Sequence, residues 1–145
     1  MGTSAGAFLV VLGILIFFHE FGHFLVARFF GVGVEKFSLG FGPRLIGKRV
    51  GITDYRLSLV PLGGYVKMVG EEPDEDLDPQ LIPLSFTHKH VLKRMLIVFA
   101  GPLFNMLLAV VVFFIIALFS GILILKPTVG TVKEGSPAHA AGLQK

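Results

Sequence analysis

Two histidines and a glutamate stand at a spacing that can hold a metal ion: His19-Glu20-Phe21-Gly22-His23, an H-E-x-x-H sequence. Residues four apart lie on the same face of an α-helix, so both imidazoles can reach one Zn²⁺ at about 2.0–2.1 Å. Glu20 follows the first ligand and can act as general base toward a water that the metal activates. Gly22 leaves room for another segment to approach. The pattern predicts a zinc hydrolase with Zn²⁺ as cofactor, although five residues also match by chance in unrelated proteins.

The H-E-x-x-H sequence lies inside a long apolar segment, residues 5–30. Its 26 or so residues would form a helix of about 39 Å, enough to cross a hydrocarbon core of about 30 Å. We therefore predict a transmembrane helix. Ionisable side chains inside a span usually mark function, which favours the metal site over polar side chains that merely extend to the interface. A signal peptide is the competing interpretation, but no basic residue precedes the segment and no A-x-A site follows it.

A second apolar segment, residues 96–125, contains no charged residue and predicts a second transmembrane helix. Gly101-Pro102 near its start is tolerated in a membrane where neighbouring protein satisfies the freed backbone groups, so we expect that end to pack against protein. The chain is 53% hydrophobic, as a membrane protein should be. It has no cysteine, which excludes disulfides, thiolate metal sites and cysteine nucleophiles.

The segment between the spans, residues 31–95, is rich in basic residues: ten of the 13 lysines and arginines fall from Arg28 to Arg94. By the positive-inside rule it is cytoplasmic, and both outer ends of the chain face the opposite side. Residues 31–70 are glycine-rich, and apolar and polar residues alternate in parts of this segment, which predicts a β-hairpin. Residues 71–95 are first acidic and then basic, and predict an exposed loop in which His88 and His90 are solvated. The net charge of +3, without a basic run interleaved with aromatics, gives no indication of nucleic acid.

The two ends of the chain differ from the rest. Residues 126–145 have the pattern of a strand, a turn and the start of a helix. Residues 1–4 resemble an artificial leader.

Four motifs together resemble the site-2 protease family of intramembrane zinc metalloproteases, in its bacterial regulator of sigma-E protease type. They are His19-Glu20-Phe21-Gly22-His23-Phe24, Phe37-Ser-Leu-Gly-Phe-Gly-Pro, Pro61-Leu-Gly-Gly-Tyr-Val-Lys-Met and Ala100-Gly-Pro-Leu-Phe-Asn. The resemblance covers essentially the whole chain. It implies a mainly α membrane protein: two transmembrane helices joined by a cytoplasmic loop with a β-hairpin, followed at residues 126–145 by the start of a PDZ-like domain.

The resemblance also implies an activity, the cleavage of transmembrane segments within the inner membrane of a bacterium. His19 and His23 would bind zinc and Glu20 would be the catalytic base. The implied partners are the lipid bilayer and a membrane-protein helix, either an anti-sigma factor or a signal-peptide remnant. The family takes a further ligand from the Asp of an L-D-G motif, which the only Leu-Asp pair here, Leu77-Asp78, does not match because Pro79 follows. We therefore expect these 145 residues alone to bind zinc weakly and to be inactive.

Substrate contacts are expected at two further places. Gly63, Gly64 and Tyr65 belong to the motif that resembles the membrane-associated β-loop of the family, where a sheet edge could pair with an extended substrate; an ordinary hairpin packed under the helices is the alternative. Asn105 could bind substrate, bind the active-site helix or bridge the helices. Two other functions use the same residues: a metal or proton transporter, and a scaffold without metal. Two spans unlike each other do not suggest the repeats of a transporter.

Overall fold

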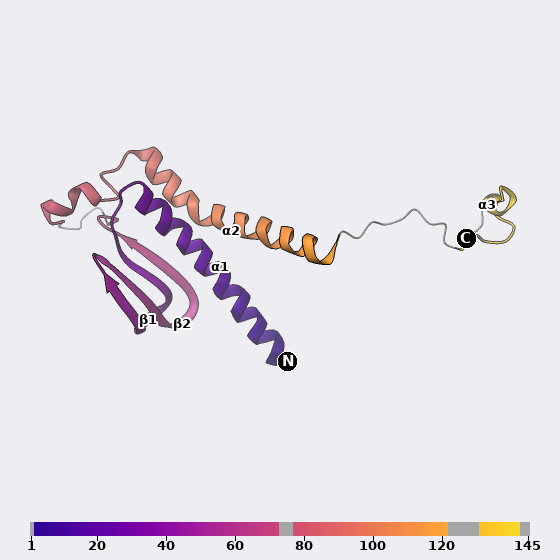
Figure 1. Cartoon of the computed structure of the whole chain (residues 1–145), viewed down its shortest axis with the longest axis horizontal. Coiled ribbons are helices and arrows are strands. Elements are labelled where there is room, and N and C mark those ends of the chain that lie inside the picture. Colours follow the sequence, from indigo (N-terminus) through magenta and orange to yellow (C-terminus); the bar gives the residue numbers. More distant parts are fainter. Residues whose placement is uncertain (1, 73–76, 122–130, 143–145) are drawn as a thin grey trace. The chain divides into compact units, whose positions relative to one another are not determined.

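The computed structural model describes residues 2–72, 77–121 and 131–142. Their elements, in chain order, are α1 (Gly2–Phe29), β1 (Val34–Val50), β2 (Thr53–Met68), a short 3-10 helix η1 (Pro79–Leu84), α2 (Val91–Ser120) and α3 (Pro137–Ala140) (Figure 1). The chain up to Val112 is one compact unit, and the residues from Phe113 onward are a second. The functional residues considered below all belong to the first unit.

The helices α1 and α2 have the length and composition of membrane spans. The apolar stretch of α1 covers 26 residues, Ser4–Phe29, and α2 covers 30. At 1.5 Å per residue both exceed the thickness of about 30 Å that a hydrocarbon core presents. Large apolar side chains such as Phe8, Val10 and Val110 are more than half exposed, as side chains that face lipid would be. Both helices expected from the sequence are therefore present.

The bounds of α2 differ from residues 96–125. The helix begins at Val91, and the backbone N–H of Leu92 donates to Nδ1 of His90 at 3.3 Å, which satisfies one free donor of the first turn. Lys93 and Arg94 interrupt the apolar run but not the helix, because long basic side chains can extend from a helix end into the interface. The helix ends at Ser120, and residues 122–125 lie outside the described part of the chain.

The strands β1 and β2 form one antiparallel sheet, which confirms the predicted hairpin. Both strands are much longer than the sequence suggests, because each is bent and contributes two pairing segments. Residues 36–39 pair on one side with residues 64–67 and on the other with residues 54–57. Gly40, with a φ of 90°, lies at the bend of β1 in a conformation that glycine adopts without strain. Glycines that suggest turns in the sequence therefore lie at bends inside a strand.

A small apolar core joins the end of α1, the sheet and the start of α2. Its buried members are Ala27, Val32, Val34, Met68 and Ile97. The loop after the sheet is fixed to this core by backbone hydrogen bonds from Gly33 to Leu84 (2.8 Å) and from Phe86 to Val69 (2.8 Å). Residues 84–86 of the loop are therefore held beside the ends of the sheet, while acidic residues 74–76 lie outside the described residues.

In the second unit, α3 begins after Ser136, whose hydroxyl accepts a hydrogen bond from the backbone N–H of His139 at 3.3 Å. The strand expected near residue 126 lies outside the described residues. The start of a PDZ-like domain stays a prediction.

Candidate metal centre

His19 and His23 lie on the face of α1 that meets α2. Their Nε2 atoms are 3.4 Å apart, with ring centroids separated by 5.0 Å. Two ligands held tetrahedrally at 2.0–2.1 Å from one zinc ion are themselves about 3.4 Å apart. The spacing of the two nitrogens therefore fits a shared zinc ion.

The other ring nitrogen of His23 is fixed by α2. Nδ1 of His23 donates a hydrogen bond to the backbone carbonyl oxygen of Ile97 at 2.7 Å. With the proton on Nδ1, the lone pair of Nε2 is free for a metal, which is the usual arrangement around a ligating histidine. The partner of this ring is therefore a backbone group.

Asn105 on α2 plays the corresponding part for His19. The side-chain Nδ2 of Asn105 is 3.4 Å from Nδ1 of His19, and its buried Oδ1 has no hydrogen-bond partner among the described residues. The two ends of an amide are assigned from such networks, and turning this amide over would place its oxygen against the Nδ1–H of His19. Nε2 of His19 would then also be a free ligand. Of the roles expected for Asn105, a contact with the active-site helix is present.

Two glycines allow the helices to meet closely at the histidines. A Cβ on Gly22 would lie 2.5 Å from the carbonyl oxygen of Ala100, so the close approach expected at Gly22 is made by the second span. A Cβ on Gly101 would lie 2.8 Å from Nε2 of His19 and closer still to Nε2 of His23. Ala100 is only 1% exposed, so this end of α2 packs against protein as expected. Gly101 keeps the space beside both ligand atoms free of a side chain.

A cavity of about 270 Å³ opens beside the pair of histidines. It is lined by five of the residues that the sequence singles out, His19, Glu20, Gly63, Gly64 and Asn105, together with four apolar residues. Glu20 and β2 are in close contact here, since a Cβ on Gly64 would lie 2.9 Å from Cγ of Glu20.

Two expected site residues, His23 and Tyr65, do not line this cavity. The ring of Tyr65 instead stacks on Phe41, with ring centroids 6.3 Å apart and an interplanar angle of 4°. Phe41 does line the cavity. Sequence reasoning did not single out Phe41 or Gly101 as site residues, although both belong to motifs that it noted.

Within the residues that the structure describes, no third His, Asp or Glu joins His19 and His23 in a group able to hold a metal. Asp78, the acid of the Leu-Asp pair, instead accepts a hydrogen bond from the backbone of Gln80 at 3.0 Å at the start of η1. His88 also has a local partner, the hydroxyl of Ser85 at 2.9 Å. His19 and His23 thus fit two of the three protein ligands of a catalytic zinc.

Comparison with known proteins decides the family. Residues 7–142 match the family described as Peptidase family M50. The chain belongs to peptidase family M50. This is the site-2 protease family that the four motifs resemble, so that resemblance is confirmed.

Proteins from several bacteria are similar to this chain over nearly all of its length. Protease RseP of Yersinia pestis is 46% identical over 142 residues, which are 97% of this chain and 31% of the relative. A Vibrio cholerae protein named as a zinc metalloprotease is 46% identical over 140 residues, 95% of this chain and 30% of the relative. A Campylobacter jejuni protein named in the same way is 45% identical over 139 residues, 96% and 38% of the two chains. The chain thus spans about a third of these relatives.

Proposed function

We propose that this chain is the part of an intramembrane zinc endopeptidase that carries two metal ligands and the general base. The observation that carries the proposal is the 3.4 Å separation of the two Nε2 atoms on a helix long enough to span a membrane. The M50 match and the relatives named as zinc metalloproteases support a protease. No comparable observation favours the transporter.

His19 and His23 would hold the zinc ion, together with a ligand from another part of the full-length protein. When bound, zinc supplies a Lewis acid that polarises a carbonyl oxygen and activates water. Glu20 lines the cavity beside the histidines, where it can take a proton from the attacking water and pass it to the amide nitrogen that leaves. Without a third ligand, the 145 residues alone would be inactive.

The substrate would be a transmembrane segment of another membrane protein, unwound at the bond that is cut. Gly63 and Gly64 line the cavity without side chains, so an extended segment could reach the backbone of β2 and pair with it beside Glu20. By family resemblance, an anti-sigma factor or a signal-peptide remnant is the expected source of this segment. We place the protein in the bacterial inner membrane, with residues 31–95 on the cytoplasmic side and a PDZ-like domain beginning near residue 126.

Replacing Glu20 tests the assignment. In the full-length zinc-loaded protein, Glu20→Gln should lower the cleavage rate of a transmembrane substrate by at least about 10²-fold, the contribution typical of a general base. Zinc content, measured by mass spectrometry of the metal, should stay near that of the unaltered protein, because Glu20 is not a ligand. Glu72→Gln, an exposed acid outside the cavity, is the matched control. Full cleavage by the Glu20 variant would refute the proposal.

A further inference from the structure

A second cavity, of about 470 Å³, lies in the sheet and shares no lining residue with the one beside Glu20. Charged side chains dominate its wall: four basic residues and two acids. They are Lys36, Arg44, Arg49, Arg56, Glu35 and Asp54. The proteolytic function uses none of them.

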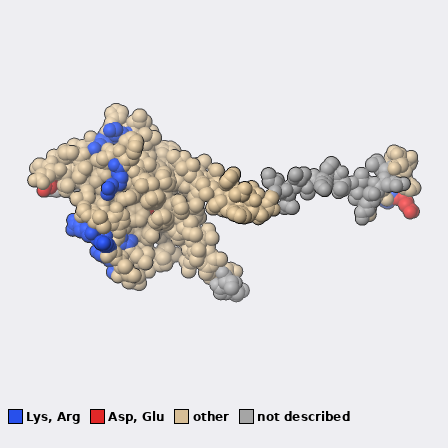
Figure 2. Space-filling view, viewed as in Figure 1, with Lys and Arg blue, Asp and Glu red and all other residues tan. Residues whose placement is uncertain are grey.

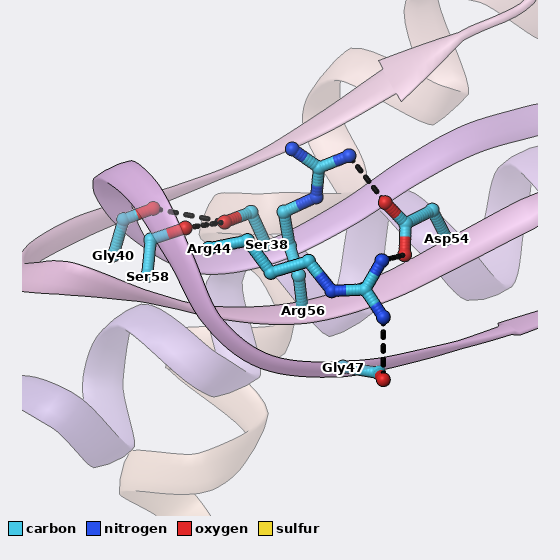
Figure 3. A network of polar contacts seen from close by, with 7 residues as sticks. All are labelled: Ser38, Gly40, Arg44, Gly47, Asp54, Arg56 and Ser58. Atoms are coloured by element: carbon cyan, nitrogen blue, oxygen red, sulfur yellow. Dashed lines mark hydrogen bonds and ion pairs between the residues drawn. The ribbon is translucent and has the colours of Figure 1, made fainter.

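One carboxylate organises two of the arginines. Asp54 is in ion pairs with Arg44, at 3.1 Å, and with Arg56, and Figure 3 shows its two oxygens each facing one guanidinium group. Arg44 also donates to the carbonyl oxygen of Gly47 at 2.5 Å. The side chains of Arg56 and Asp54 are only 18% and 15% exposed. The guanidinium groups are therefore held in place before any ligand arrives, and such planar groups suit phosphate oxygens.

The charges of this wall do not balance. Asp54 compensates one of its two arginines, and Glu35 is 3.6 Å from Lys67, a lysine outside the cavity wall. Within the described part of the chain, no acid forms an ion pair with Lys36 or Arg49. An excess of positive charge therefore surrounds a space of the size that small ligands occupy, which complements an anion.

Exposed aliphatic side chains lie at and near the turn between β1 and β2. Ile52, a lining residue in the turn, is 40% exposed, and Val50 and Ile46 in the adjoining part of β1 are 57% and 71% exposed. Two of the cavity's lining residues, Glu35 and Lys36, lie at the start of β1, a few residues after Arg28 in the last turn of α1. Figure 2 shows that on this face lysine and arginine gather over the sheet and the start of α2, while the visible middle parts of α1 and α2 carry none. A bound phosphate would thus sit at headgroup level, beside side chains suited to acyl chains.

We propose that this cavity binds the phosphate of an anionic phospholipid headgroup, with the exposed aliphatic residues of the turn against its acyl chains. Lipid, and not free phosphate, is the ligand, because a free ion would leave those aliphatic side chains in water. The bound lipid would anchor the sheet to the cytoplasmic leaflet, on the side where we place residues 31–95. This site is independent of the proteolytic one, so either assignment can fail without the other.

The test is a titration of the full-length protein, in a non-ionic detergent, with short-chain phosphatidylglycerol, counting bound lipid by native mass spectrometry. One lipid should bind, and phosphatidylcholine should bind about tenfold more weakly, because its phosphate is accompanied by a choline cation that the basic wall repels. Arg49→Gln should lower the affinity for phosphatidylglycerol by about tenfold. Lys48→Gln is the control: Lys48 is exposed, adjacent and equally charged, but does not line the cavity, so its loss should have at most the few-fold effect of a surface charge. Circular dichroism should be unchanged in both variants.

Four results would overturn the proposal. Equal losses in the two variants would indicate diffuse surface attraction, and equal binding of phosphatidylcholine would show that headgroup charge is not recognised. Binding of inorganic phosphate as tight as that of the lipid would indicate a free-anion site. If lipid binds only after the acidic residues 74–76 are neutralised by substitution, the natural ligand of the cavity would be this acidic segment of the same chain.

Discussion

Nδ1 of His23 donates a 2.7 Å hydrogen bond to the backbone carbonyl oxygen of Ile97. The contact joins α1, which carries both histidines, to α2, which contributes no metal ligand within the described residues. Asn105 gives α2 a second contact, at 3.4 Å from Nδ1 of His19. Because these partners fix which ring nitrogens are free, α2 should control zinc affinity.

Gly101→Ala should weaken metal binding while leaving the spans folded. The added methyl group would lie 2.8 Å or less from both Nε2 atoms, so the rings must turn away and lose their contacts with α2. Altered surroundings of metal ligands commonly weaken metal affinity by about 10–100-fold. Titration with Co²⁺, followed by its visible absorption, measures this loss. Gly13→Ala is the control, because no atom lies within 4 Å of its added Cβ. Equal affinity in the two variants would contradict the role given to Gly101.

Asn105→Leu keeps the size of the side chain but removes the partner of His19. We expect zinc affinity to fall by about tenfold, at the lower end of the range for outer-shell partners, because His23 keeps its own contact. The same metal titration measures the change. Met106→Leu, at a 67% exposed position one residue away, should behave like the unaltered protein. If Asn105 only bridges helices, thermal stability will fall while zinc affinity stays constant.

Gly22→Val should separate α1 from α2. Its Cβ would already lie 2.5 Å from the carbonyl oxygen of Ala100 and 2.9 Å from Cγ of Phe104, and overpacking of this kind typically costs about 1–3 kcal/mol. The midpoint of thermal unfolding in detergent should therefore fall. Gly6→Val provides the comparison, since an added Cβ there meets nothing within 4 Å. An unchanged midpoint for Gly22→Val would show that the helices can separate without loss.

Gly64→Val should lower proteolysis without removing zinc. The side chain would push against Cγ of Glu20, 2.9 Å away, and against Cγ2 of Ile16 at 3.0 Å, and it would fill the cavity where we place the substrate. Misplacing a catalytic group by about 1 Å can lower the rate by about 10²-fold. The ratio kcat/KM with a transmembrane substrate, measured beside the zinc content, separates the two effects. Loss of zinc in parallel with activity would indicate a wider disruption of the site.

Two buried serines offer a check on the sheet itself. The hydroxyl of Ser38 donates to the carbonyl oxygen of Gly40 at 2.9 Å and lies 3.1 Å from the hydroxyl of Ser58 (Figure 3). Ser38→Ala leaves both partners unsatisfied in a fully buried place, at a cost of about 1–3 kcal/mol. Ser58→Ala leaves the contact with Gly40 intact and should cost about 0.5–1.5 kcal/mol. Urea unfolding curves for the two variants should rank them in this order.

The sequence by itself predicted both apolar helices and singled out His19, Glu20 and His23 as the candidate site. The length of an apolar run is enough to predict a membrane-spanning helix. Helical periodicity alone places His19 and His23 on the same face of that helix. Family membership was equally accessible, because it depends on local motifs in a fixed order. The expected β-hairpin is present as an antiparallel pair of strands, although both strands are longer than predicted.

Only the tertiary structure decided what surrounds the two histidines. The partner of His23 is a main-chain carbonyl at Ile97, and every residue type has that group, so no residue pattern could indicate it. In the sequence, Gly101 stands out only as a helix breaker beside Pro102. In the structure it lies against the imidazoles of His23 and His19, which are 78 and 82 positions away in the chain. The long bent strands were likewise hidden, because a glycine at a bend and a glycine at a turn look the same until the neighbouring strand is in place.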